Sequence, residues 1–249
     1  MKEYPSVHAM NAAQRVEIVR EIFSSVTNRY DFLNRFLSLR RDVHWREAAV
    51  KAMNFFNTNK LLDVATGTAD LALDCVRLHP EVHVVGVDFV PAMIQKGIDK
   101  VIAAGLQNQI QLYEGDGTGL QFADNSFDVC SIAFGIRNIP DRAKTLTEMF
   151  RVVVPGGQVI VLELTTPEAG FWHRVYGFYL NGLIPRLARI FSRNPAAYEY
   201  LADSIMNFPT RNQFINLMTA AGLEHCRAQA LTWGICTLYV GVKPEEKNE

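Results

Sequence analysis

The chain has 249 residues, a hydrophobic content of 49%, a charged content of 20% and a formal net charge of −1. This composition excludes an intrinsically disordered chain and a broadly nucleic-acid-binding one, and the length fits one large α/β domain. The N-terminus lacks the apolar core of a signal peptide, and no segment reaches the run of about 18 to 20 apolar residues that spans a bilayer. We therefore expect a cytoplasmic protein that contacts membranes through its surface alone, and no nucleic-acid partner.

The four cysteines form no Cys-x-x-Cys pair; they are Cys75, Cys130, Cys226 and Cys236. Structural thiols in a reducing compartment are favoured over metal or redox chemistry. We expect no metal site.

The chain begins with an expected helical cover, residues 1–56. Apolar residues recur at helical spacing through residues 11–53, beginning with Val16, Val19, Ile22 and Phe23. Residues 57–164 then alternate short apolar runs with helical stretches. The expected strands are residues 61–65, 82–87, 110–113, 127–133 and 158–163. This alternation predicts a parallel, doubly wound sheet with right-handed crossovers.

Beyond residue 164 the alternation stops. Residues 171–193 are aromatic and basic, residues 211–221 read as a helix, and residues 237–242 read as a strand. The predicted organisation is a single domain, residues 1–249, in which 57–164 binds the cofactor, 165–222 faces substrate or membrane, 223–243 forms terminal strands and 244–249 is a tail.

Polar residues at the predicted strand ends form a candidate cofactor site, because ligands of open parallel sheets bind beyond the carboxyl ends of the strands. Gly67 lets the backbone approach a ligand closely, and Thr68 can donate a hydrogen bond. Asp88 can accept from both hydroxyls of a ribose. Asp116 and Gly117 can contact an adenine edge.

The dinucleotide fingerprint Gly-x-Gly-x-x-Gly is incomplete, because Gly67 is followed by Thr-Ala-Asp-Leu-Ala. This disfavours a pyrophosphate, whereas a cofactor made of adenosine and an amino acid needs no phosphate cradle. The alternative is a tight structural turn, but acidic residues at successive strand ends favour binding.

Segments in order through nearly the whole chain resemble the ubiquinone/menaquinone biosynthesis C-methyltransferase family, within the class I methyltransferases. The more specific ones are Tyr30-Asp-Phe-Leu-Asn34, Phe134-Gly-Ile-Arg-Asn138 and Tyr198-Glu-Tyr-Leu201. The turn Leu62–Asp70 and Gly115-Asp116 are shared more widely among methyltransferases. The resemblance implies a Rossmann-like, mostly parallel sheet of seven strands, with a helical cover and a helical insertion before the last strands.

The resemblance also implies that S-adenosylmethionine is the cofactor, held by Thr68, Asp88, Asp116 and Gly117, with Gly67 in the same turn. The chain departs from the family pattern at two positions. Ala69 stands where the family usually has a second glycine, which is tolerable if the residue lies on the helix side of the turn. Ala133 stands where the family often has a serine.

The implied reaction is methyl transfer to a ring carbon of a quinol, which becomes electron-rich when a neighbouring hydroxyl loses its proton. Arg137 and Asn138 are the expected catalytic residues, because they can stabilise the phenolate. Arg137 stays protonated in proteins, so the proton leaves through water or another base.

Four further residues are candidate substrate contacts: Glu163, Tyr30, Asn34 and Tyr198. A structural ion pair is an equal alternative for Glu163, as is helix capping or packing for Tyr30 and Asn34. His44 and His173 are considered as bases, but lone histidines are more often packing or solvent-facing residues.

The segment from Phe171 to Arg193 contains four arginines and no acid among many aromatic residues. Such a segment suits the inner face of a membrane. A prenyl tunnel, a homodimer contact and an ordinary helix pair packed on the core are the alternatives.

The favoured activity is methylation of demethylmenaquinol to menaquinol, with a lipid-soluble quinol as the partner. The alternatives are methoxybenzoquinol methylation in ubiquinone biosynthesis, methylation of a soluble aromatic acceptor, and a non-catalytic scaffold that binds a cofactor or a lipid.

Overall fold

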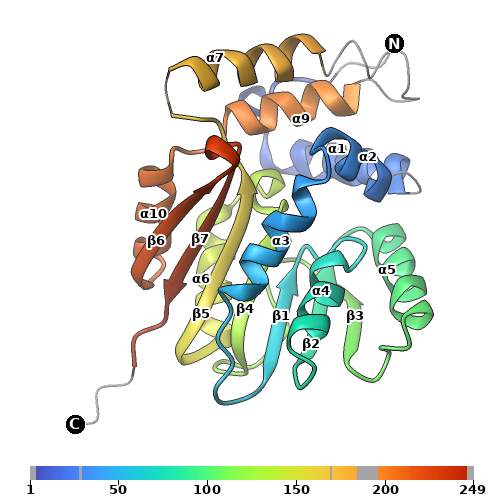
Figure 1. Ribbon diagram of the computed structural model, residues 1–249, viewed down its shortest axis with the longest axis vertical. Coiled ribbons are helices and arrows are strands. Elements are labelled where there is room, and N and C mark those ends of the chain that lie inside the picture. The colour runs from blue at the N-terminus through green and yellow to red at the C-terminus, as the bar shows by residue number, and fades with distance from the viewer. Residues whose placement is uncertain (1–3, 28–29, 169, 184–195, 246–249) are drawn as a thin grey trace.

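Seven strands form one sheet in the order β3-β2-β1-β4-β5-β7-β6, in a computed structural model that describes residues 4–27, 30–168, 170–183 and 196–245 (Figure 1). The strands are β1 (Lys60–Val64), β2 (His83–Asp88), β3 (Ile110–Glu114), β4 (Phe127–Ala133), β5 (Val153–Leu164), β6 (Glu224–Leu231) and β7 (Cys236–Val242). Neighbours from β3 to β5 are parallel, whereas β7 pairs antiparallel with both β5 and β6. The predicted doubly wound, mostly parallel α/β fold is confirmed.

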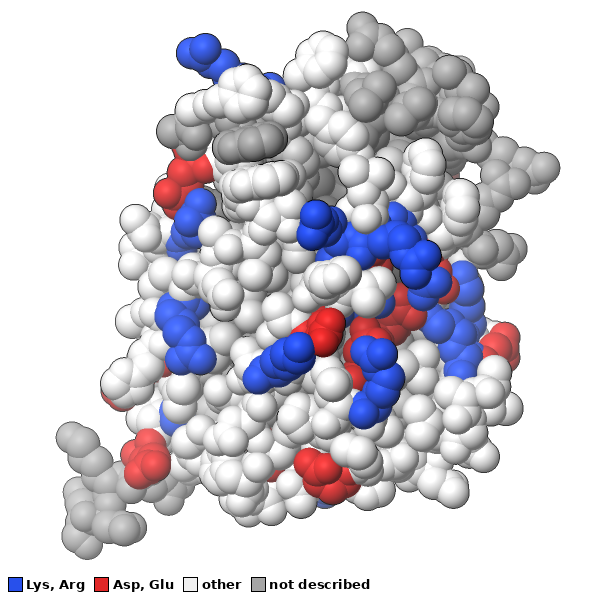
Figure 2. All heavy atoms as spheres, in the orientation of Figure 1, with Lys and Arg blue, Asp and Glu red and all other residues white. Residues whose placement is uncertain are grey.

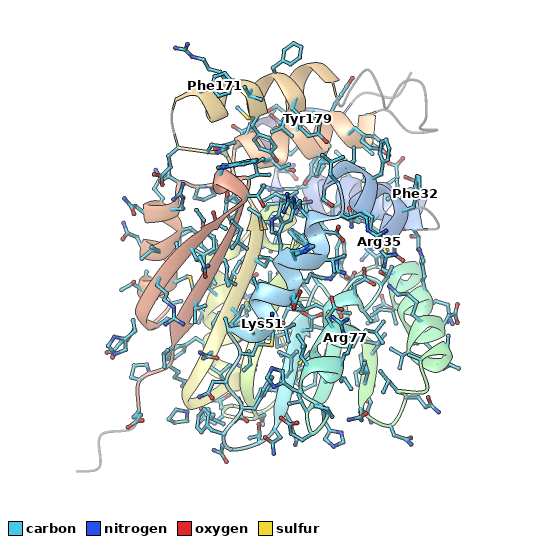
Figure 3. The ribbon with its side chains drawn as sticks, in the orientation of Figure 1. Phe32, Arg35, Lys51, Arg77, Phe171 and Tyr179 are labelled. Atoms are coloured by element: carbon cyan, nitrogen blue, oxygen red, sulfur yellow. The ribbon has the colours of Figure 1, made fainter. Side chains whose placement is uncertain are left out.

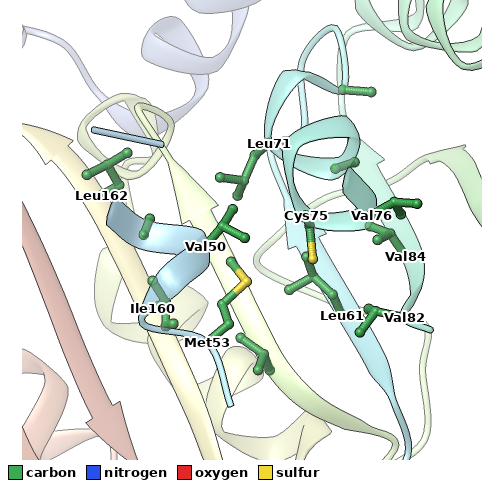
Figure 4. Close-up of a cluster of buried hydrophobic side chains, with 14 of the residues drawn as sticks. Val50, Met53, Leu61, Leu71, Cys75, Val76, Val82, Val84, Ile160 and Leu162 are labelled. Atoms are coloured by element: carbon green, nitrogen blue, oxygen red, sulfur yellow. The ribbon is translucent and has the colours of Figure 1, made fainter. Parts of the chain in front are cut away.

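Helices cover both faces of this sheet. One face carries α3 (Arg41–Lys51), α4 (Asp70–Leu78) and α5 (Pro91–Ala103), and the other carries α6 (Arg142–Val152) and α10 (Arg211–Ala220). Because both faces are covered, the central strands are almost continuously buried, which is why they read as unbroken apolar runs. Figure 4 shows part of the core, where Val50 of α3 and Cys75 of α4 approach Leu61 of β1.

A helical cap lies over the carboxyl edge of the sheet (Figure 1). It comprises η1 (Val7–Ala9), α1 (Ala12–Val26), α2 (Tyr30–Leu37), α7 (Phe171–Phe178), the π-helical turn η4 (Tyr179–Leu183) and α9 (Ala196–Met206). Val19 and Ile22 of α1 pack in one cluster with Tyr176 of α7 and Tyr198 of α9. The Tyr179 hydroxyl donates to the carbonyl of Leu37 at 2.8 Å, so η4 is tied to the end of α2 within the cap. Figure 3 shows Tyr179 in this part of the molecule.

One strand, β5, differs from the sequence expectation, whereas β6 lies within residues 223–243, where terminal strands were expected. β5 begins at Val153, ahead of the Pro155-Gly156-Gly157 segment that reads as a turn, and the strand passes through that segment with a register shift against β4. Gly156 supports the irregularity with a φ of +79°. β6 is an edge strand with many exposed residues, so its residues carry no apolar run.

Charged side chains of both signs alternate on the face that carries α3 and α4 (Figure 2). Arg46 of α3 pairs there with Asp42 and with Asp74 of α4, each at 2.9 Å.

Burial raises the thiol pKa values of Cys75, Cys130 and Cys236. Among the described residues, no group of His, Cys, Asp and Glu side chains could hold a metal ion. No helix within the described ranges is both long and apolar enough to cross a bilayer. The expected tail from residue 246 onward, and residues 184–193 of the aromatic and basic segment, lie outside those ranges.

Candidate active site

A cavity of about 270 Å³ opens at the carboxyl edge of the sheet, beneath α1. We call it the sheet-edge cavity. The turns that follow β1, β2, β3 and β4 form its walls, and the predicted residues Gly67, Asp88, Asp116 and Gly117 all line it. The sequence therefore predicted which strand ends come together, because parallel strands present their carboxyl ends at one edge.

The turn after β1 is unusually tight. Ala65, Gly67 and Ala69 all have positive φ, at 52°, 56° and 64°. Asp63 anchors the turn from below, accepting hydrogen bonds from the hydroxyls of Thr66 at 2.7 Å and Ser131 at 2.8 Å. Burial raises the pKa of Asp63 to about 6, against the effect of these two hydroxyls.

Ala69 does not lie on the helix side of the turn. It is the N-cap of α4 and adopts the left-handed conformation that favours glycine. We expected alanine to be tolerated here in place of glycine only if the residue belonged to the helix, and it does not. Its methyl group is fully buried in the core, and this burial offsets part of the backbone strain.

Asp88 lies at the end of β2 with its carboxylate held by backbone amides. Oδ2 accepts from the amide of Gly67 at 2.8 Å, and Oδ1 accepts from that of Val90 at 2.9 Å. Burial raises the pKa of Asp88 to about 6, although the amides oppose the shift. A carboxylate offers about four acceptor positions, so Asp88 can still accept from a pair of hydroxyls on a ligand.

Gly117 lets the wall of the sheet-edge cavity approach β1. A Cβ at this position would lie 2.8 Å from Cγ1 of Val64, which is closer than carbon atoms pack. The neighbouring Asp116 accepts a hydrogen bond from the amide of Thr118 at 2.8 Å, which fixes its side chain at the cavity wall.

Thr68 is buried but does not line the sheet-edge cavity. Its hydroxyl donates to Oδ1 of Asp31 on α2 at 2.6 Å and accepts from Nζ of Lys100 at 3.2 Å. Burial alone would raise the pKa of Asp31, but Thr68, Lys100 and Lys96 hold it below its usual value. The side chain of Thr68 is therefore not placed to contact a cofactor in the sheet-edge cavity, as had been expected. Its hydrogen bond to Asp31 instead connects the glycine turn to α2.

A second cavity, of about 70 Å³, lies between α1, α2, α9 and the short helix η3 (Ile136–Asn138). We call it the cap cavity. The predicted residues Arg137, Asn138, Asn34 and Tyr198 line it, and most of the remaining lining is apolar. Asn138 and Phe23 line both cavities, so the two share a wall.

Arg137 is held by Glu163. Its Nη1 lies 2.7 Å from Oε1 of Glu163, and its backbone amide donates to Oε2 at 3.0 Å. Glu163 is fully buried, accepts a further bond from the amide of Leu164, and lines neither cavity. The structural ion pair fits this position, and the expected contact of Glu163 with substrate does not.

Three residues beside Arg137 were not predicted. Arg15 and Arg142 both donate to the Arg137 carbonyl, Arg142 at 3.2 Å. Tyr200 lines the cap cavity. Burial raises the pKa of its phenol above the ordinary value, and the neighbouring Arg15 opposes only part of this shift. The guanidinium groups of Arg15, Arg137 and Arg142 therefore lie close together beside the cap cavity. The carboxylate of Glu163 neutralises part of their positive charge. Arg15 occupies the same face of α1 as Val19 and Ile22, so a lone cation on an apolar face is the one sequence feature that could have drawn attention to it.

The remaining candidates lie elsewhere. His44 is exposed on α3 and lines neither cavity. The side chains of Tyr30 and His173 fall outside the described part of the structure. Ala133 lines the sheet-edge cavity at the end of β4.

Comparison with known proteins identifies the family. Residues 9–243 match the model of the ubiE/COQ5 methyltransferase family. The chain belongs to this family. The predicted resemblance is thereby confirmed, and the chain is a C-methyltransferase.

Similar proteins cover almost the full length. The chain is 43% identical to a protein of a Geobacter species named ubiquinone/menaquinone biosynthesis C-methyltransferase UbiE, over 93% of this chain and 98% of that one. It is 40% identical to the demethylmenaquinone methyltransferase of Deinococcus radiodurans, over 91% and 93%.

Solved structures share the fold at low identity. Phosphoethanolamine N-methyltransferase 2 of Haemonchus contortus, in complex with S-adenosylhomocysteine, matches 81% of this chain and 53% of its own, with a TM-score of 0.62 and 15% identity. A SAM-dependent methyltransferase of Thermotoga maritima matches 90% and 98%, with a TM-score of 0.61 and 17% identity.

Proposed function

We propose that this ubiE/COQ5 methyltransferase transfers a methyl group from S-adenosylmethionine to a ring carbon of a prenylated quinol, converting demethylmenaquinol to menaquinol. The observation that carries the proposal is the shared wall of the two cavities, where Asn138 and Phe23 border both. Such a wall lets a donor in one cavity and an acceptor in the other approach each other.

The sheet-edge cavity fits the cofactor. Asp88 would hold the ribose hydroxyls, and Asp116 with Gly117 would lie against the adenine. The tight turn at Gly67 supplies a close backbone approach without a phosphate cradle. When bound, the cofactor would supply a methyl group on a sulfonium sulfur, which is a good leaving group because it departs as a neutral thioether.

The residues around the cap cavity suit a phenolate acceptor. A phenol has a pKa of about 10 in water, so ionisation at neutral pH needs a positive environment. Arg137 supplies a fixed cation whose direction Glu163 sets, and Arg15 and Arg142 add charge behind it. Asn138 Oδ1 is buried without a hydrogen-bond partner among the described residues, so it can accept from a quinol hydroxyl before ionisation.

The cap cavity also suits an apolar tail, because Ile22, Val26, Leu37 and Leu201 line it. This lining favours a prenylated acceptor over a soluble aromatic one. The names of the relatives support both the menaquinone and the ubiquinone pathway, and the demethylmenaquinone methyltransferase of Deinococcus radiodurans supports the former.

Peripheral membrane contact through Phe171 to Arg193 is part of the proposal. Within the described portion, Phe171 and Phe178 of α7 are 71% and 69% exposed at the outer side of the cap. Figure 3 shows Phe171 at this end of the molecule. An exposed aromatic pair of this kind can enter a bilayer interface.

Turnover on three reduced acceptors tests the proposal: a short-chain demethylmenaquinol, a short-chain methoxybenzoquinol and an unprenylated naphthalenediol. We expect the highest kcat/KM for the demethylmenaquinol. Equal or higher values for the unprenylated acceptor would contradict the prenyl-binding role of the cap cavity.

A further inference from the structure

The outer side of α2 carries large apolar side chains in contact with solvent. Phe32 and Phe36 lie one helical turn apart, with stacked rings whose centroids are 6.0 Å apart, and are 67% and 52% exposed. Leu39, in the turn after α2, is 83% exposed. Scattered exposed apolar residues are ordinary, but three in one short segment indicate a contact surface.

Arginines flank these side chains. Arg35, Arg40 and Arg41 are exposed, and none of them forms an ion pair with a described residue. The nearest acids in the sequence are already neutralised, because Asp31 lies 3.1 Å from Lys96 and Asp42 pairs with Arg46. We call Phe32, Arg35, Phe36, Leu39, Arg40 and Arg41 the α2 surface. Basic side chains gather over this part of the molecule in Figure 2, and Figure 3 shows Phe32 and Arg35 at the edge of the cap.

The opposite side of the same helix faces the cap cavity. Asn34 and Leu37 line that cavity, and at about 100° per residue they project away from Phe32 and Phe36. A single helix thus separates the α2 surface from the proposed acceptor site.

We propose that the α2 surface docks on the headgroup region of an anionic lipid bilayer. Aromatic rings occupy the boundary between headgroups and acyl chains, while arginines pair with anionic headgroups. A second copy of this chain fits less well, since a two-fold contact would bring the arginines of both copies together. The purpose of docking rests on the proposed function, because it brings the cap cavity within reach of a lipid-soluble quinol.

Vesicle flotation tests the charge requirement. The protein should bind vesicles of phosphatidylcholine with phosphatidylglycerol much more tightly than vesicles of phosphatidylcholine alone. Arg35→Gln/Arg40→Gln should weaken binding to the anionic vesicles about 25-fold, since each basic residue near the surface contributes about a factor of five. Lys51→Gln/Arg77→Gln removes the same charge at the far ends of α3 and α4 (Figure 3) and should keep the wild-type affinity. Equal binding to both vesicle types, or an unchanged Arg35→Gln/Arg40→Gln variant, would overturn the proposal.

The apolar requirement has its own matched pair. Phe32→Ser/Phe36→Ser should reduce vesicle binding roughly tenfold. Phe56→Ser/Ile102→Ser, which removes two side chains that are 51% and 58% exposed near the amino edge of the sheet, should not. If sedimentation velocity instead shows a dimer that Phe32→Ser/Phe36→Ser dissolves, the surface belongs to a second copy and the proposal is wrong.

Turnover measured on a water-soluble quinol and on a vesicle-borne quinol distinguishes an effect on membrane docking from an effect on catalysis. The α2-surface variants should keep wild-type turnover on a water-soluble short-chain quinol and lose about tenfold on a long-chain quinol carried in anionic vesicles. Wild-type turnover of the variants on the vesicle-borne quinol would overturn the docking role. Vesicle binding without methyl transfer to either quinol would leave docking supported and contradict the proposed function.

Discussion

Arg137 and Asn138 are consecutive residues of η3, yet only one of them borders both cavities. Arg137 lines the cap cavity, whereas Asn138 lines both the cap cavity and the sheet-edge cavity. The pair thus places a fixed cation beside the proposed acceptor and a neutral amide at the boundary with the proposed cofactor.

Replacement of Asn138 should affect chemistry far more than cofactor binding. We expect Asn138→Ala to lower kcat about a hundredfold, because the acceptor for the quinol hydroxyl, which positions the ring, is lost. Calorimetric affinity for S-adenosylhomocysteine should stay near that of the wild type. Asn212→Ala, on the exposed side of α10, is the control and should retain full turnover. A kcat for Asn138→Ala close to the wild-type value would remove this residue from the mechanism.

Cofactor affinity should depend on pH through Asp88. Burial raises the pKa of this carboxyl to about 6, and the ionised form is the better acceptor for ribose hydroxyls. Affinity for S-adenosylhomocysteine should therefore fall as the pH drops below about 6, by up to about tenfold per pH unit. Asp88→Ala should weaken binding throughout, and Asp88→Asn should give a flat profile. Unchanged affinity in Asp88→Ala would contradict the assignment.

The raised pKa of Asp88 should affect folding stability in the opposite direction to cofactor affinity. Because the folded-state pKa of Asp88 lies above the unfolded value, its ionisation opposes folding. The ligand-free protein should gain stability from this group as the pH falls from about 6 toward about 4. Denaturant titration of the wild type and Asp88→Asn checks the sign, because Asp63 titrates in the same range and remains in both proteins.

Variants of the buried ion pair between Arg137 and Glu163 should distinguish the contribution of Arg137 to folding stability from its contribution to turnover. Arg137→Ala leaves the fully buried Glu163 without its cation, which should cost about 3–5 kcal/mol of unfolding free energy. Arg137→Met/Glu163→Gln removes both charges and should recover most of this loss, while turnover stays low. Recovery of turnover together with stability would show that Arg137 is structural. So would equal losses of turnover and cofactor affinity in Arg137→Ala.

Two glycines of one loop offer a matched test of the cavity wall. Gly117→Ala should cost about 1–3 kcal/mol, because the added methyl group would collide with Val64, and it should also weaken cofactor binding. Gly119→Ala has nothing within 4 Å of the added methyl group and should change stability by less than about 0.5 kcal/mol. Similar effects of the two substitutions on melting temperature would contradict the packing argument.

The sheet was predictable because its central strands are buried on both faces and read as apolar runs that end in glycine or acidic turns. The edge strand β6 has mostly exposed and half-buried residues, so it was expected from the family resemblance alone. The start of β5 was missed because the sequence Pro155-Gly156-Gly157 is typical of a turn. In the structure these glycines instead allow an irregular stretch of strand.

The site was predictable where function follows strand ends, as at Asp88 and Asp116. It was not predictable where segments distant in sequence meet, because local patterns carry no contact information. Arg15, Arg142 and Tyr200 come from three separate helices, and Thr68 is turned toward Asp31 by a helix whose position the sequence does not fix.

The most direct test of the account is the reaction itself, with purified protein, a reduced short-chain demethylmenaquinol and methyl-labelled S-adenosylmethionine. Mass spectrometry of the product should show one labelled methyl group on the vacant ring carbon. Label on a quinol oxygen, or no transfer by a protein that still binds S-adenosylhomocysteine, would contradict C-methylation of a prenylated quinol at the two adjoining cavities.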